Sequence, residues 1–207
     1  MGILERRERD RQTVRTKILD CARELFAAEG YDAVTMRRIA EAIEYSPTTI
    51  YLYFKDKDAL IRELCRLDLN TLAQAFHAIA GEPDPVERLR RIGKALVAFG
   101  TEQPNHYRLL FMSTHLIEEE EMEEMGHGNP ENDGYAFLLG TIREAIEQQR
   151  FSAHLQDAHL LAQAFWASVH GTVALHLSKS GDTWVEWRTL EETADFIIES
   201  MVRGIQR

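Results

Sequence analysis

Hydrophobic positions recur at helical spacing from one end of the chain to the other. Apolar side chains fall three and four residues apart, and the periodic stretches end at glycine, proline or polar clusters. No stretch shows the two-residue alternation of a β-strand. The pattern predicts an all-α protein. The expected helices cover about residues 13–29, 36–43, 46–54, 57–80, 85–104, 105–113, 135–149, 155–178 and 190–207.

Two of these helices are short and lie almost end to end between Thr35 and Lys57. Thr35 can cap the first of them, and Ser46 followed by Pro47 is a start signal for the second. Only a tight turn fits between them, and a helix pair of this size needs a third helix to pack on. The pattern predicts a helix-turn-helix whose second helix, 46–54, enters a DNA groove.

The second helix has an outward surface suited to nucleic acid. On a helical wheel Ile50 and Phe54 face the core, whereas the outward side chains include no carboxylate. These outward residues are Thr48 and Leu52 at the apex, with Thr49, Tyr51 and Tyr53 on the flanks. The alternative is that the YLYF run is the core of an ordinary helical domain, but the capping signals on both sides favour the helix-turn-helix.

The stretch from about Thr13 to Leu64 resembles the DNA-binding domain of the TetR family of bacterial transcriptional regulators. The matching residues are Ile18, Ala22, Leu25, Phe26, Gly30, Tyr31, Thr35, Ile39, Ala40, Ser46, Thr49, Ile50, Tyr51, Tyr53, Phe54, Lys55, Lys57, Leu60 and Leu64. The family usually has a glycine in the turn between the two helices, where this chain has Ile43-Glu44-Tyr45. Glu44 is therefore expected to adopt a turn conformation that favours glycine.

The resemblance implies a division of labour along the chain. Residues 1–56 are expected to form the helix-turn-helix DNA-binding domain, and residues 57–207 a helical bundle for effector binding and dimerisation. A lysine at the start of the helix that follows Asp56 is also placed to meet a phosphate. The candidate DNA-binding residues are Thr35, Arg37, Ser46, Thr48, Thr49, Tyr51, Leu52, Tyr53 and Lys57.

The charge distribution supports this division. The chain of 207 residues has a net charge of −10, yet residues 1–57 contain 11 basic and 10 acidic residues. The net negative charge therefore lies outside the expected DNA-binding domain. The basic residues at the start form either a solvated arm or contacts to phosphates and a minor groove. They are Arg6, Arg7, Arg9, Arg11, Arg15 and Lys17.

The expected location is the cytoplasm. Cys21 and Cys65 are far apart in sequence and form no CxxC pair, which fits a reducing compartment. The N-terminus lacks the apolar run of a signal peptide. Polar residues interrupt the most apolar stretch, 160–177, so a buried helix is expected there and no membrane partner is predicted.

The helix over 155–178 is apolar on more than one side and needs more cover than one chain of this size supplies. A partner chain is the economical source, and the resemblance implies a homodimer through the last two helices. Candidate interface residues are Ala164, Phe165, Ile197 and Met201. The alternative is an internal core helix of a monomer.

Aromatic and polar side chains along the helical domain suggest a pocket for a small, largely apolar effector. The candidates are His106, Phe111, Phe137, Trp166 and His170. Taken singly, each of these residues also fits a packed core. The resemblance, which places the family's pocket in these helices, supports the grouping.

No catalytic residue, metal site or cofactor is predicted. His115 has metal-ligand spacing to Glu118 and Glu119, but an acidic solvated face explains this segment, and HExxH, GxSxG and GxGxxG motifs are absent. The hypothesis is a repressor that binds a palindromic operator in double-stranded DNA as a homodimer and is released by an effector. The alternatives are an enzyme hidden in the helical domain and a ligand-free architectural DNA-binding protein.

Overall fold

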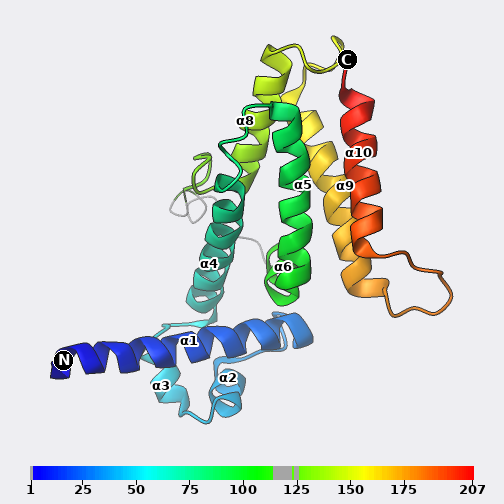
Figure 1. Cartoon of the computed structure of the whole chain (residues 1–207). Coiled ribbons are helices and arrows are strands. Elements are labelled where there is room, and N and C mark those ends of the chain that lie inside the picture. Colours follow the sequence, from blue (N-terminus) through cyan, green and yellow to red (C-terminus); the bar gives the residue numbers. More distant parts are fainter. Residues whose placement is uncertain (1, 114–122, 124–125) are drawn as a thin grey trace. The chain divides into compact units, whose positions relative to one another are not determined.

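The computed structural model describes residues 2–113, 123 and 126–207, and the regular elements in these residues are α-helices (Figure 1). The predicted all-α fold is confirmed for this part of the chain. The helices are α1 (Ile3–Glu29), α2 (Met36–Ala42), α3 (Pro47–Tyr51), α4 (Lys57–His77), α5 (Pro85–Glu102), α6 (Pro104–Phe111), α8 (Gly134–Glu147), α9 (Ala158–Lys179) and α10 (Leu190–Ile205).

Side-chain caps set many of the helix starts. The Thr35 hydroxyl oxygen accepts a hydrogen bond from the Arg38 N–H at 3.1 Å, and Ser46 accepts one from the Thr49 N–H at the same distance. Both predicted caps are thereby confirmed. Further helices of the bundle begin at Asp84, Asp133, Asp157 and Thr189, whose side chains accept hydrogen bonds from the first turn.

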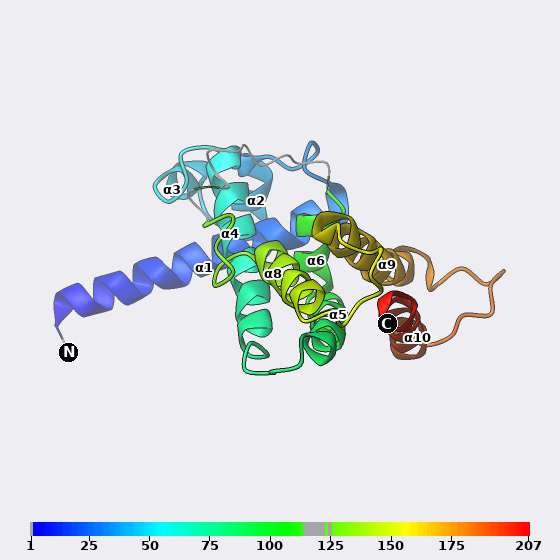
Figure 2. The same cartoon turned by 90° about the horizontal axis from the view of Figure 1, so that it is seen from above.

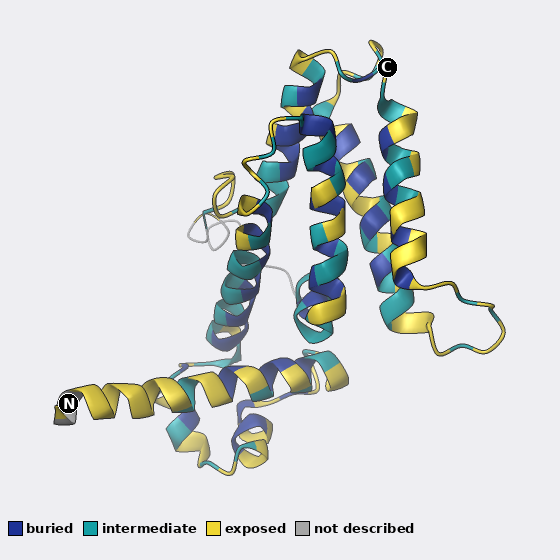
Figure 3. Cartoon of the chain, in the orientation of Figure 1, coloured by how far each residue is buried: buried dark blue, intermediate teal, exposed yellow. Residues whose placement is uncertain are grey.

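Helix α1 starts ten residues earlier than predicted. The expected start at Thr13 is wrong, because the helix begins at Ile3, where the Gly2 N–H donates to the Glu5 carboxylate at 2.8 Å. Residues 3–13 contain neither glycine nor proline and are rich in arginine and glutamate, which favour helix. In Figure 3 residues 5–13 of α1 are exposed.

The chain divides into two compact units. The first comprises the described residues within Met1–Asp68 and Asn105–Glu118, and the second those within Leu69–Pro104 and Glu119–Arg207. In the first unit one hydrophobic core joins α1, α2, α3, the start of α4 and α6; the α6 residue Leu109 is 3% exposed in that core. The predicted domain boundary after residue 56 lies inside this unit.

The second unit is a helical bundle in which α5, α8, α9 and α10 pack side by side (Figure 2). Gly93 on α5 lets the neighbouring helices approach closely, since a Cβ there would lie 2.8 Å from Ile198 and 3.1 Å from Phe165. Ion pairs from Arg88 to Glu144 at 2.6 Å and from Arg90 to Glu199 at 2.7 Å link α5 to α8 and α10.

Some expectations concern residues outside the described part of the chain. The acidic segment before Gly126 falls almost entirely there, as do His115, Glu118 and Glu119. Within the described residues no cluster of three or more potential metal ligands is present. Over the same residues, no helix combines the length and apolarity needed to cross a bilayer.

Candidate nucleic-acid interface

Helices α2 and α3 form the predicted pair, joined by a tight turn. Glu44 adopts a positive φ of 59°, as the missing glycine requires, and the Tyr45 N–H closes the turn on the Ala40 carbonyl at 2.9 Å. The turn thus keeps its geometry without glycine. The cost is a left-handed conformation for a residue with a side chain.

The second helix of the pair is shorter than predicted. Helix α3 ends at Tyr51 instead of Phe54, and Leu52 and Tyr53 form a turn. The Phe54 N–H still donates to the Ile50 carbonyl at 3.1 Å, so helical hydrogen bonding reaches the predicted end. Ile50 and Phe54 are buried in the core of the unit, as the helical wheel predicted.

The opposite side of α3 is exposed and partly apolar. Leu52 is 74% exposed and Tyr51 is 53% exposed, and Thr48 is exposed beside them. Large apolar side chains held in water by a rigid three-helix core suit contact with base edges, and leucine can meet a thymine methyl. On α2 the side chain of Arg37 is 81% exposed and pairs with Glu41 at 3.0 Å.

Some of the candidate DNA-binding residues also position the helices. Ser46 and Thr49 share a hydrogen bond of 2.8 Å between their hydroxyl groups, in addition to the Ser46 cap, and Thr35 caps α2. Their hydroxyl oxygens therefore serve the local fold. Their contact with DNA stays a prediction.

Lys57 has a structural role that the sequence did not indicate. Its ammonium group donates to the carbonyl oxygens of Tyr31 at 2.9 Å and Val34 at 3.1 Å, and lies 4.0 Å from the centre of the Tyr31 ring. The Tyr31 hydroxyl donates to Asp58. Burial, reinforced by this bond, raises the pKa of Tyr31 to about 12. Lys57 therefore helps to hold the loop between α1 and α2, in addition to any contact with DNA.

Arg15 of the N-terminal basic group is tied to the core of the first unit. Its guanidinium lies 2.6 Å from the Glu63 carboxylate and 5.3 Å from the centre of the Phe54 ring. The hydrogen bond from Arg66 is the main cause that holds the pKa of Glu63 below its usual value, and the hydrogen bond from Arg15 lowers it further. Arg15 therefore helps to fix α1 against α4.

The candidate effector residues fall into both units. In the first, His106 Nδ1 lies 2.8 Å from a carboxylate oxygen of Asp68, and Phe111 packs on Tyr107 with ring centres 4.9 Å apart. The His106 side chain therefore lies against a buried carboxylate, and its contact with an effector stays a prediction. Asp68 is 1% exposed.

In the second unit two of the other three candidates, Phe137 and Trp166, lie beside aromatic rings. Phe137 packs on Phe76 with ring centres 6.1 Å apart, and Trp166 lies 6.1 Å from Tyr135. Burial lowers the pKa of His170 below its ordinary value of 6.5. A mixture of aromatic walls and a few polar groups is present here, whereas a pocket that joins all five candidates stays a prediction.

The predicted dimer residues differ in exposure. Ala164, Ile197 and Met201 are partly exposed, but Phe165 is 2% exposed and packs inside the protomer. Phe165 therefore offers little surface to a partner, because its ring already fills the core beside Gly93. The exposed apolar residues of α9 and α10 are instead Leu160, Trp166, Leu175 and Phe196.

Comparisons with known proteins cover both units. The family model described as "Bacterial regulatory proteins, tetR family" matches residues 18–64, and "Tetracyclin repressor-like, C-terminal domain" matches residues 89–201. The HTH-type transcriptional repressor Rv1474c of Mycobacterium tuberculosis is 48% identical over 59 residues, which are 28% of this chain and 32% of that protein. The regulator UidR of Escherichia coli is 31% identical over 85 residues, 41% of this chain and 40% of its own length.

Solved structures match over nearly the whole chain at lower identity. A TetR family transcription regulator from Marinobacter aquaeolei aligns with a TM-score of 0.75 and 21% identity, covering 97% of this chain and 100% of that one. The ketosteroid transcriptional regulator KstR2 of Mycobacterium tuberculosis aligns with a TM-score of 0.74 and 19% identity, covering 93% and 95%. The fold is therefore shared throughout. Since the C-terminal family model alone matches more than half of the residues, the chain belongs to the TetR family of bacterial regulatory proteins.

Proposed function

We propose that this chain is a transcriptional repressor that binds a palindromic operator as a homodimer and is released by a small, largely apolar effector. The observation that carries the proposal is the outward side of α3. There Leu52, Tyr51 and Thr48 are exposed on a rigid helix-turn-helix, with no carboxylate among them. This surface fits base edges and the thymine methyl group of a major groove.

A dimer supplies the spacing that an operator needs. Two α3 helices must lie about 34 Å apart to enter successive turns of the major groove on one side of the duplex. The exposed apolar residues Leu175 on α9 and Phe196 on α10 leave surface for a second copy to cover. A four-helix seam of two α9 and two α10 helices is the arrangement proposed.

The aromatic neighbourhood of Trp166, Phe137 and His170 is the proposed effector region. Regulators with the same fold are named for ketosteroids and, in Bacillus halodurans, for fatty acid degradation. Those names suggest a panel of fatty acids and steroids. An effector from such a panel must bind the released state more tightly than the DNA-bound state, since equal affinity shifts no equilibrium.

The DNA claim is tested with a duplex that the full chain itself selects from a pool of random sequence. Fluorescence anisotropy then gives the dissociation constant for the chain and its variants. Tyr53→Ala is expected to weaken binding to every duplex, whereas Leu52→Ala and Thr48→Val are expected to change which sequence is preferred. Failure of the wild-type chain to select any sequence would refute the proposal.

The effector claim is tested on the same complex. A compound from the panel is expected to release the duplex from the wild-type chain but not from Trp166→Ala. Leu160→Ala, also exposed on α9, is the matched control and should respond like the wild type. If no apolar compound releases the DNA, the effector part of the proposal fails while the DNA part stands.

A further inference from the structure

The first turns of α1 form a helical extension with exposed arginines. From Glu5 to Thr13 every residue is exposed, and the burial of α1 in its core begins only with Val14 and Arg15. In both Figure 1 and Figure 2 this segment projects beyond α3 within the first unit. Ordered helix without core contacts contributes little to the stability of the domain, which suggests that its surface serves another purpose.

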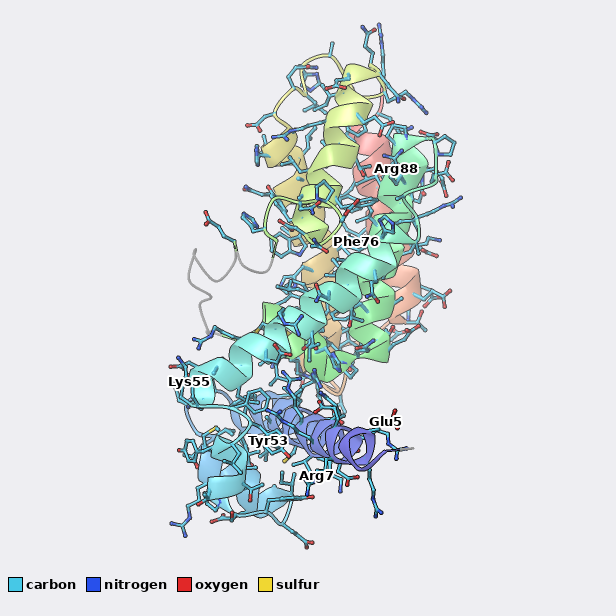
Figure 4. The ribbon with its side chains drawn as sticks, turned by 90° about the vertical axis from the view of Figure 1, so that its left-hand side faces the viewer. Glu5, Arg7, Tyr53, Lys55, Phe76 and Arg88 are labelled. Carbon is cyan, nitrogen blue, oxygen red and sulfur yellow. The ribbon has the colours of Figure 1, made fainter. Side chains whose placement is uncertain are left out.

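One face of the extension lines a groove shared with the recognition helix. The groove has a volume of about 500 Å³. Its walls are Arg7, Asp10, Arg11 and Val14 from α1, with Leu52 and Tyr53 from the turn that follows α3. Figure 4 shows Arg7 and Tyr53 in this part of the unit.

The spacing of these residues places two guanidinium groups on the same side as the proposed base-reading surface. Residues 7, 11 and 14 stand at i, i+4 and i+7, so they share one helix face. At a rise of 1.5 Å per residue Arg7 and Arg11 lie about 6 Å apart along α1, so both guanidinium groups can reach the same stretch of phosphate backbone.

The two arginines carry charge that the described structure does not neutralise by ion pairing. Arg15, by contrast, pairs with Glu63, and Arg37 pairs with Glu41. Within the described residues Arg7 and Arg11 have no carboxylate within salt-bridge distance, although Asp10 lines the same groove. An exposed, unpaired guanidinium beside a DNA-reading helix is complementary to a phosphate oxygen.

We propose that Arg7 and Arg11 bind backbone phosphates of the operator on the flank of the base pairs read by α3. The inference rests on the proposed function and extends it by a second contact surface, which lengthens the DNA site beyond the helix-turn-helix. Asp10 opposes this contact, because its carboxylate lies in the same groove as the two guanidinium groups.

The test uses the full chain and its selected duplex, prepared with long flanks or trimmed to the bases read by α3. Arg7→Gln/Arg11→Gln removes two charges and keeps good helix formers. On the long duplex this variant is expected to bind at least about tenfold more weakly at 0.15 M salt. Removing one phosphate contact lowers the slope of log affinity against log salt by about 0.9, which gives about 3.6 for two arginines in each protomer of a dimer.

A matched control separates a specific contact from general charge. Arg6→Gln/Arg9→Gln removes the same charge from the same turns; neither residue lines the groove, and Arg9 lies on nearly the opposite side of α1. This control should bind the long duplex like the wild type. Asp10→Asn should bind it more tightly. On the trimmed duplex all variants should match the wild type.

Each other outcome overturns the inference. Equal losses in the test and control variants would show a non-specific charge effect. Wild-type affinity of Arg7→Gln/Arg11→Gln would show that the extension does not touch DNA, while operator binding itself would stand. A loss seen with A·T-rich flanks but not with G·C-rich flanks would assign the arginines to a narrow minor groove instead of to phosphates. If the wild-type chain bound no duplex, the proposed function would fail first.

Discussion

Single residues of the helix-turn-helix raise or lower the free energy of unfolding, and each contribution can be measured separately. Glu44 has a φ of 59°, in a region that costs a residue with a Cβ about 1 kcal/mol or more. Glu44→Gly removes this cost but increases the conformational entropy of the unfolded chain. A net stabilisation of up to about 1 kcal/mol is therefore expected. Urea unfolding measures it. As a control, Glu41→Gly in the neighbouring helix α2 should destabilise the chain. A loss of stability in Glu44→Gly would show that Glu44 is not strained.

Lys57 should contribute to stability more than a surface lysine does. Its ammonium group satisfies two backbone carbonyls and lies over the Tyr31 ring. Lys57→Ala is expected to cost about 1–3 kcal/mol in the free energy of unfolding. Lys55, whose side chain is 76% exposed, is the matched control, and Lys55→Ala should change stability by less than about 0.5 kcal/mol. Equal effects of Lys57→Ala and Lys55→Ala on the free energy of unfolding would contradict a structural role for Lys57.

His170 should make the stability depend on pH. Burial lowers its pKa in the folded chain below 6.5, so near that pH the unfolded chain binds more protons than the folded chain. The free energy of unfolding contributed by this group therefore falls as the pH drops from about 7.5 to 5.5. Chemical unfolding of His170→Gln should show a weaker loss over this range. His154→Gln, at an exposed position, should retain the wild-type loss.

At the level of elements, a buried ionic network joins three helices of the first unit. Asp68 on α4 accepts hydrogen bonds from Arg23 on α1 at 2.8 and 3.3 Å, and His106 on α6 lies 2.8 Å from the same carboxylate. Arg23 is 8% exposed, so loss of its partner strands a buried charge. Asp68→Ala is expected to cost about 3–5 kcal/mol.

A control for the network lies on the surface. The Asp20 carboxylate is 3.4 Å from the same guanidinium, but its side chain is 63% exposed. Asp20→Ala should therefore cost less than about 1 kcal/mol. Thermal or urea unfolding compares the two variants. Similar small losses for both would mean that the network does not hold α6 to α1 and α4.

The element boundaries show what a sequence can and cannot predict. Caps and prolines placed the starts of α2, α3 and α5 within a few residues, because these signals are local. The start of α1 was missed because residues 5–13 are all charged or polar. Without apolar residues at helical spacing, the sequence does not distinguish a helix from a solvated arm. The place of Leu109 in the core of the first unit was also missed, because that packing joins residues far apart in the chain.

The same reasoning explains the errors at the candidate site. The wheel of α3 predicted Ile50 inward and Leu52 outward, because only the helical period was needed. The bonds of Lys57 to the Tyr31 and Val34 carbonyls depend on a loop that the period does not describe. The helical period places Phe165 on an apolar face, whether its own chain or a partner chain covers that face. The structure shows that its own chain covers this ring, because Phe165 packs beside Gly93 of α5.

For the whole molecule, assembly and DNA binding should be lost together. Leu175→Glu and Phe196→Glu place charges on the exposed apolar surfaces of α9 and α10. Sedimentation should show monomers, and anisotropy should show loss of binding to the selected duplex, because one α3 cannot span two half-sites. Ala28→Glu, exposed on α1, should leave both properties unchanged. A monomeric variant that still binds the full site with wild-type affinity would contradict the dimer.

Protection of guanine N7 from methylation on the selected duplex tests the central claim most directly, because N7 lies in the major groove. The dimer is expected to protect two clusters of guanines centred about 10 base pairs apart on one side of the duplex. Leu52→Ala should alter the protection within each cluster. Binding that leaves every guanine N7 reactive in a duplex with guanines throughout the site would contradict insertion of α3 into the major groove.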